Sequence, residues 1–241
     1  DDPSVRVRAA LAYGLLHTAA APRPIILALL HDSGIIARAV AQYCPALLDA
    51  DLIAFISDAE PALLMAVAMR ETLSARVAEA LLERHDRDVA LKLLRRADSV
   101  LSPASLLRLA EESGRLDPDI RGALLARHDL PATARLLLVE AVTEALRGLR
   151  LVSGAIQPKR LDRLMLDLAD TALTTIGESV AGGPRAIYAV TLIKADRIST
   201  RVMLHPIANG QEMFFADCIA ELSELWREQV VTLLETSSRA P

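Results

Sequence analysis

Asp117-Pro118-Asp119-Ile120-Arg121 repeats, almost unchanged, the first residues of the chain, Asp2-Pro3-Ser4-Val5-Arg6. The two copies are the outer members of a series of five aspartates, and the intervals between successive members are 30, 26, 28 and 31 residues. The series consists of Asp2, Asp32, Asp58, Asp86 and Asp117. Apolar residues at helical spacing lie on both sides of each aspartate. A period of this size predicts stacked helical hairpins.

Each aspartate is expected at the turn of a hairpin, with one helix before it and a second helix after it. The first copy lacks its leading helix because the chain starts inside it, and we expect the chain to be a fragment of a longer product. Residues typical of N-caps and prolines mark several helix starts. The expected helices around the other four aspartates are 24–30 and 35–43, 51–56 and 62–70, 74–83 and 89–96, and 102–111 and 120–127.

The apolar pattern lengthens beyond Pro131 and predicts further helices. Residues 152–158 contain Gly154 and Pro158 and are expected to be a break between the first two of them. Residues 186–193 fit either a helix or a lone strand, and we expect a helix because nothing nearby offers a pairing partner. The expected helices are 132–149, 159–180, 186–193, 199–207, 212–222 and 226–234.

The composition indicates an aliphatic core. Hydrophobic residues make up 52% of the chain but aromatic residues only 3%, so Ala, Leu, Val and Ile must fill the interior. The mean hydropathy of +0.31 is high. The longest apolar runs, Ile25 to Leu30 and Leu136 to Val139, are nevertheless far shorter than the roughly 20 residues that a membrane-spanning helix needs. With no signal-peptide pattern, we expect a soluble, cytoplasmic protein with no membrane partner.

The net charge argues against a nucleic-acid partner, and the two cysteines against a metal site or a disulfide framework. The formal net charge of −4 argues against a protein whose main task is binding phosphate backbones, so we do not expect a nucleic-acid partner. Cys44 and Cys218 are far apart and have neither metal-ligand spacing nor a disulfide framework around them. We expect both to be buried free thiols.

Several phrases of the sequence resemble known helical-repeat proteins. The Asp-x-x-Val-Arg pattern before an Ala/Leu-rich helix is similar to HEAT and related armadillo-type repeats. Four longer phrases, in this order along the chain, resemble an alphaproteobacterial family catalogued as "domain of unknown function 2336". These phrases are Pro45 to Ile53, Leu73 to Leu81, Arg127 to Pro131 and Phe214 to Leu222. The resemblance is strongest from about Pro45 to Pro131, and it implies an all-helical solenoid with no assigned activity.

Together these observations predict an all-α fold, a right-handed α-solenoid of HEAT-like helical hairpins with additional C-terminal helices. We expect HEAT-like repeats over residues 1–150. Residues 151–241 are expected to form a C-terminal helical region that continues or caps the stack.

A recurring His-Asp pair is the strongest signal for catalysis or metal binding. The pairs are His31-Asp32, His85-Asp86 and His128-Asp129. Imidazole and carboxylate ligands suit a divalent metal. Equivalent turns of stacked repeats, however, lie roughly 10 Å apart per helix layer, so ligands on different turns cannot meet on one ion. We interpret the pairs as turn and cap residues, and we expect no metal.

Other catalytic motifs are absent from the sequence. It contains no Gly-x-Ser-x-Gly elbow. Gly182-Gly183-Pro184 is interpreted as a helix stop and Gly210 as a turn, so neither forms a phosphate-binding loop. We therefore expect no catalytic residues, no cofactor and no enzymatic activity.

The second helices carry a possible basic row. Positions six and ten residues after each turn aspartate lie on one helix face. Stacking would bring these positions of successive repeats into one row. Its cations are Arg8, Arg38, Lys92, Arg96 and Arg127, and Leu64 and Ala68 interrupt it. In helical-repeat proteins the second helix usually lines the concave, partner-binding surface. We expect a partner with acidic side chains around an apolar anchor over Leu64 and Ala68. The alternative, a merely solvated helix face, remains open.

Two functions are compatible with these patterns. The leading hypothesis is a non-enzymatic scaffold that binds a protein partner on its concave face, plausible in regulation or signalling. The alternative is an enzyme on a helical-repeat scaffold, such as a DNA glycosylase-like base-excision enzyme. Fold alone supports neither. The sequence leaves the identity of the partner and the oligomeric state open.

Overall fold

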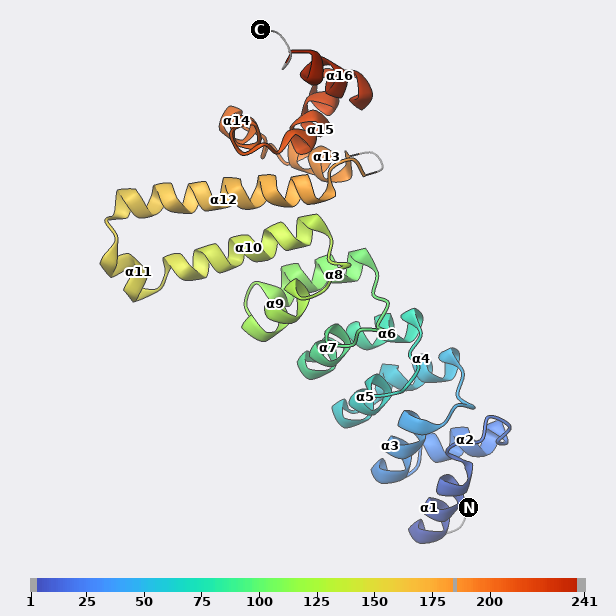
Figure 1. The fold of residues 1–241 in the computed structure, drawn as a ribbon. Coiled ribbons are helices and arrows are strands. Elements are labelled where there is room, and N and C mark those ends of the chain that lie inside the picture. Colours follow the sequence, from blue (N-terminus) through green and yellow to red (C-terminus); the bar gives the residue numbers. More distant parts are fainter. Residues whose placement is uncertain (1–3, 184–185, 238–241) are drawn as a thin grey trace. The chain divides into compact units, whose positions relative to one another are not determined.

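The computed structural model describes residues 4–183 and 186–237, and over these residues it is all-α (Figure 1). They form sixteen α-helices and one π-helical turn, with no strand in these two ranges. Asp2 and Pro3 of the first turn motif, and Pro184 of the predicted helix stop, lie outside the described residues. None of the helices in the described part is both long and apolar enough to cross a bilayer.

The helices divide into two compact units. The N-terminal unit comprises Asp1–Arg108 with Asp117–His128, and the C-terminal unit comprises Leu109–Leu116 with Asp129–Pro241. The predicted boundary at residue 150 differs from this division, because the helix that starts at Ala132 packs within the C-terminal unit.

The N-terminal unit consists of consecutive helix pairs. Its helices are α1 (Val5–Leu15), α2 (Arg23–Leu30), α3 (Gly34–Tyr43), α4 (Asp49–Asp58), α5 (Pro61–Ala68), α6 (Ala75–Leu82), α7 (Arg87–Leu94), α8 (Pro103–Leu109) and α9 (Pro118–Leu125). Helices α2 and α3, α4 and α5, and α6 and α7 pack against each other. We call α3, α5, α7 and α9 the second helices. Each packs on the next, and α1 packs on α3, as predicted for a copy without its leading helix.

The turn aspartates lie at or beside the turns within these pairs. Asp86 and Asp117 are the N-caps of α7 and α9. Each accepts hydrogen bonds from two backbone N–H groups of the first helical turn, at 2.9–3.3 Å. Asp58 instead ends α4, and the residues before α3 and α5 are Ser33 and Glu60, whose side chains make no capping bond. The distance from aspartate to helix start therefore varies from one copy to the next.

The core of the N-terminal unit is aliphatic, as the composition predicts. Each second helix contributes a fully buried residue at the matching position, and these residues are Val40, Val67, Leu93 and Leu124. Small partners such as Ala41 and Ala68, also fully buried, allow the helices to approach closely.

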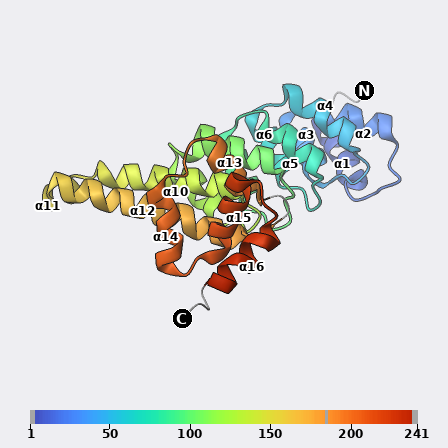
Figure 2. The same cartoon turned by 90° about the horizontal axis from the view of Figure 1, so that it is seen from above.

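The C-terminal unit is built around a long helical hairpin. It contains the π-helical turn Ala110–Gly114, α10 (Ala132–Arg147), α11 (Arg150–Ala155), α12 (Pro158–Val180), α13 (Ile187–Lys194), α14 (Thr200–Asn209), α15 (Glu212–Ser223) and α16 (Arg227–Ser237). Helices α10 and α12 lie side by side in both views (Figures 1 and 2) and are joined by α11. Part of the predicted break is therefore helical. The first helix ends early because Gly148, a poor helix former, is its C-cap.

Phe214 is at the centre of the core of the C-terminal unit. It is 1% exposed and packs with Leu136, Ile176 and Tyr188, whose ring centroid lies 5.9 Å from that of Phe214. The hydroxyl of Tyr188 donates to the carbonyl of Leu173 at 3.2 Å. Residues 187–194 are a helix, so the preferred alternative of the two sequence interpretations is confirmed.

Candidate functional site

Arg96 was predicted on the exposed basic row, but the structure places it between two repeats. Its side chain is only 13% exposed. One guanidinium nitrogen donates to the carbonyls of Ala68 and Arg70 at 3.1 and 2.5 Å, and another donates to that of Glu71 at 3.1 Å. These carbonyls belong to the carboxyl end of α5, in the preceding repeat.

The same arrangement recurs in the neighbouring repeats. Arg127 donates to the carbonyls of Leu94 and Ser99 beyond α7, at 3.3 and 2.8 Å. Arg70 donates to those of Ala41 and Cys44 at the end of α3, at 2.6 and 2.9 Å. We call Arg70, Arg96 and Arg127 the inter-repeat arginines. The last carbonyls of a helix have no hydrogen-bond donor within the helix, and its carboxyl end favours a positive charge. Each of these arginines supplies both the donors and the charge.

Arg70 is the most buried of the three, with 7% of the residue exposed. Burial lowers the pKa of its guanidinium, and nearby Cys44 and Asp49 act against the shift. A guanidinium stays charged in a protein even where burial lowers its pKa. The cation is therefore part of the interior of the stack.

Arginine–aspartate pairs make a second kind of contact between successive repeats. Arg8 binds Asp32 with two nitrogens, at 2.6 and 3.0 Å, and Arg87 binds Asp117 in the same bidentate way. The guanidinium hydrogen bond is the largest cause that lowers the pKa of each aspartate. Arg8, with 25% of its side chain exposed, is thus a contact within the stack and not a free surface cation.

Leu64 was predicted to be an exposed apolar anchor, and this prediction is wrong. Leu64 is 2% exposed and Ala68 is fully buried. The error comes from the alignment on the aspartates. Helix α5 begins three residues after Asp58, whereas α7 begins one residue after Asp86, so position six after the aspartate faces the core in α5.

Two of the predicted cations, Arg38 and Lys92, are exposed, and the structure adds Arg95 to them. No hydrogen bond or ion pair within the described ranges involves these three side chains. The exposed positions of each second helix recur at spacings of three and four residues, which defines one face. On α3, α5 and α7 we call this face the outer stripe, and it comprises the exposed residues Ile35, Arg38, Ala62, Met69, Asp88, Lys92 and Arg95 with the half-buried Met65.

Arg95 was missed because the sequence alignment sampled positions six and ten after each aspartate. The signal that identifies it is its spacing of three residues from Lys92, on the same helix face. Met65 is half-buried and Met69 is 41% exposed, so they replace Leu64 as the apolar centre between the cations of α3 and α7.

The His-Asp pairs do not come together in space. The ring of His31 lies edge-on to that of Phe55, with centroids 5.8 Å apart. His85 occupies a left-handed turn position with φ of 53°. Among the described residues, no three His, Cys, Asp or Glu side chains are grouped so that they could hold a metal ion. The aspartates of the first two pairs instead bind Arg8 and cap α7.

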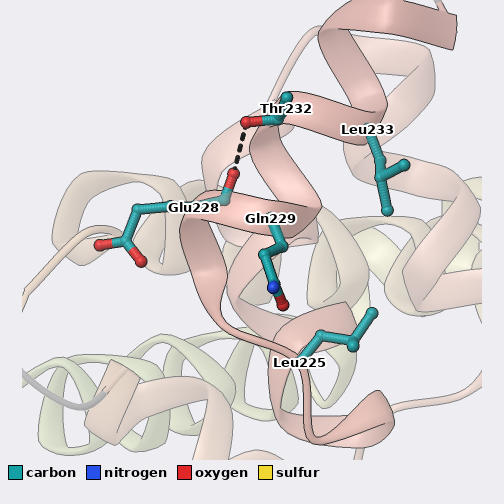
Figure 3. Close-up of a pocket in the computed structure, with 5 residues that line it drawn as sticks. All are labelled: Leu225, Glu228, Gln229, Thr232 and Leu233. Atoms are coloured by element: carbon teal, nitrogen blue, oxygen red, sulfur yellow. Dashed lines mark hydrogen bonds between the residues drawn. The ribbon is translucent and has the colours of Figure 1, made fainter.

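Hollows occur in both units. In the N-terminal unit a groove of about 400 Å³ is lined by Asp49, Arg70 and Thr72. In the C-terminal unit one of about 660 Å³ lies along α13, and one of about 520 Å³ lies on α16. Figure 3 shows the last one, where the hydroxyl of Thr232 donates to the Glu228 carbonyl of its own helix at 2.8 Å. Its other lining residues are Leu225, Gln229 and Leu233, so it is a mostly apolar depression.

Comparison with known proteins gives one family match. The model of the family described as "Uncharacterised protein conserved in bacteria (DUF2336)" matches residues 36–241. Neither the curated proteins nor the solved structures yield a match to the chain. Because the matched residues include most of both units, the chain belongs to the DUF2336 family of bacterial proteins.

Proposed function

We propose that this protein is a non-enzymatic scaffold, a right-handed α-solenoid of HEAT-like hairpins that binds a protein partner. The recurring helix pairs and the regular packing of each second helix on the next support this architecture. Helical-repeat proteins of this kind commonly use an extended surface of successive repeats for binding. We place the protein in the cytoplasm, in a regulatory or signalling role.

The outer stripe is the proposed binding surface. The single observation that carries the proposal is the contrast between two sets of cations on neighbouring helix positions. Arg96 and Arg127 are bound to backbone carbonyls within the stack, whereas Arg38, Lys92 and Arg95 are exposed on one face. Exposed cations that make no hydrogen bond or ion pair within the stack can bind a partner.

The stripe also specifies the chemistry of the partner. Its cations on α3 and α7 flank Ala62, Met65 and Met69 on α5. Interfaces commonly combine an apolar centre with a charged rim, and methionine adapts well to varied apolar partners. The partner should therefore present acidic side chains around one apolar anchor, which replaces the earlier expectation of an anchor over Leu64.

Comparative affinity capture from the native cell tests the proposal. The bait is the full-length protein, either unchanged or carrying Arg38→Glu with Arg95→Glu. The matched control carries Arg6→Glu with Arg76→Glu, two exposed arginines of the same unit that lie off the stripe. We expect a protein that is captured by the unchanged bait and by the control but lost with the stripe variant. The melting temperature should barely change, because exposed charges contribute little to stability.

The purified partner then provides a kinetic check. Charge reversal should slow association by about tenfold at low salt and by less at high salt, because long-range attraction is screened. Equal capture by the stripe variant and the control would contradict the proposal. So would a stripe that binds duplex DNA tightly and captures no protein, which is the outcome expected of the glycosylase-like alternative.

A further inference from the structure

The end of the α10–α12 hairpin has almost no interior of its own. We call residues 145–165 the hairpin tip, and it contains all of α11. Helix α11 packs mainly on α10 and lies at the far end of the hairpin from α13 and α16 in both views (Figures 1 and 2). From Val139 to Met165, Leu161 alone among the described side chains is buried. The hydrophobic cluster of the unit takes its hairpin residues from the other end, at Leu136, Leu173 and Ile176.

Leucines at the tip are exposed to solvent. Leu151 on α11 is 86% exposed, the highest value among the large apolar side chains of the described residues. Leu149, at the turn between α10 and α11, is 50% exposed, and Leu146 is 41% exposed. Several such side chains gathered at one end of a hairpin indicate an interaction site more often than isolated ones do.

The same tip is strongly basic within an acidic protein. It holds five cations and one carboxylate, Asp162, a local net charge of +4 in a chain whose net charge is −4. All five cations are exposed, and they are Arg147, Arg150, Lys159, Arg160 and Arg163. Arg147 binds Asp162 across the hairpin at 2.6 Å, which joins the ends of α10 and α12.

We propose that the hairpin tip binds the surface of an anionic lipid bilayer. Leu149 and Leu151 would enter the boundary between headgroups and acyl chains, and the surrounding cations would contact lipid phosphates. A fluid surface accommodates a protruding tip without needing a complementary groove. Contact between the tips of two copies is disfavoured, because it would bring two charges of +4 together.

This inference is independent of the proposed protein-binding stripe, which belongs to the other unit. It also departs from the sequence-based expectation of no membrane partner. That expectation rested on the length of the apolar runs, and the length criterion applies to segments that cross a bilayer. A peripheral tip needs only a few apolar side chains and a cluster of cations.

Vesicle co-sedimentation with the full chain tests the inference. One set of vesicles is pure phosphatidylcholine, and the other contains about one-third phosphatidylglycerol, an anionic lipid. A charge variant carries Arg150→Glu with Arg160→Glu, and an apolar variant carries Leu149→Ser with Leu151→Ser. Two controls change exposed residues elsewhere in the same unit, Lys194→Glu for charge and Leu204→Ser with Leu233→Ser for apolar surface.

We expect binding to the anionic vesicles only, and weaker binding at high salt. The charge variant should lower the partition coefficient at least about tenfold, since each cation near such a surface contributes roughly fivefold. The apolar variant should also lower it about tenfold, while both controls bind as the unchanged protein does. Circular dichroism should show unchanged helix content in all variants.

Three results would overturn the inference. The first is an absence of binding to anionic vesicles by the unchanged protein. The second is equal loss of binding in the controls and the tip variants. The third is a change of mass in light scattering, from dimer to monomer, when the tip is altered and no vesicle binding is seen. That result would assign the tip to self-association.

Discussion

Arginines at neighbouring helix positions have two roles, one in contacts between repeats and one on the outer stripe. Arg95 and Arg96 are adjacent in sequence, yet one is exposed and the other donates to three backbone carbonyls of the preceding repeat. The difference is one step of about 100° around the helix. Arginine suits the inner position because its planar guanidinium offers several donors in a fixed geometry.

Replacing Arg70 with methionine should destabilise the N-terminal unit. The substitution keeps an unbranched side chain as far as the position of Nε but removes the guanidinium, so the carbonyls of Ala41 and Cys44 lose their charged donor. Hydrogen bonds to a charged group are worth about 1.5–3 kcal/mol, so we expect a loss of about 2–4 kcal/mol in the free energy of unfolding. Urea unfolding measures it. Arg38→Met, at an exposed position, is the control and should stay within about 0.5 kcal/mol. Equal effects of the two substitutions would refute the structural role of Arg70.

Gly177 in α12 leaves room for a large neighbouring side chain. A Cβ atom there would overlap the ring of Phe214 at the centre of the C-terminal unit. Gly177→Ala should therefore destabilise the unit by about 1–3 kcal/mol through overpacking. This loss exceeds the gain of about 1 kcal/mol that alanine normally gives in a helix. Gly154→Ala, where nothing lies within 4 Å of the added methyl, is the matched control in α11 and should stabilise the unit by up to about 1 kcal/mol, the ordinary helical gain. A stabilised Gly177→Ala variant would contradict the packing around Phe214.

The arginine–aspartate pairs should make stability depend on pH in the acid range. Arginine hydrogen bonds lower the pKa values of Asp32 and Asp117 below their ordinary value of 3.8. A carboxyl group whose pKa is lowered on folding stabilises the protein above its unfolded pKa, and this contribution is lost as the pH falls through the folded value. We expect the unfolding free energy to fall below about pH 4. Asp117→Asn should flatten this dependence. If the unfolding free energies of the variant and the unchanged protein fall equally at acid pH, the Arg87–Asp117 pair does not contribute to the pH dependence.

At the scale of single elements, apolar periodicity was sufficient to predict nearly every helix. The helix predicted at 159–180 is observed at Pro158–Val180, and that predicted at 212–222 at Glu212–Ser223. The amphipathic pattern carries this information because burial of one face decides helix formation. Helix α11 was missed because it is six residues long and none of its residues with a described side chain is buried.

The candidate surface was harder to predict than the helices. Alignment on the turn aspartates assumed a constant distance to the helix start, and α5 departs from it by two residues relative to α7. Two residues rotate a side chain by about 200°, which moved Leu64 from the predicted surface into the core. Whether an arginine is free or bound to a carbonyl depends on the neighbouring repeat, and no pattern within one repeat contains that information.

The corrected register gives a prediction for α9. Leu124 is fully buried, whereas its neighbour Leu125 is half-buried. Leu124→Ala should therefore cost about 2–5 kcal/mol, and Leu125→Ala clearly less. Leu94→Ala, buried at 3% exposure in α7, should resemble Leu124→Ala. A larger effect at Leu125 than at Leu124, measured by urea unfolding, would contradict this register.

At the scale of the whole molecule, the chain combines two units with different internal order. The N-terminal unit repeats one helix pair and links successive copies through arginines. The C-terminal unit has a single cluster around Phe214 and a long hairpin with an exposed, basic end. We propose protein binding for the first unit and lipid binding for the second. The two proposals rest on different residues and can fail separately.

Hydrogen exchange on the complex with the captured partner tests whether the partner binds at the outer stripe. We expect slower backbone exchange in peptides from α3, α5 and α7 when the partner is bound, because an interface over the stripe suppresses local opening of these helices. Peptides from α4 and α6 should change less, and those from α12 to α16 should not change. Protection confined to the C-terminal unit, or to the first helices of the pairs, would rule out binding at the outer stripe.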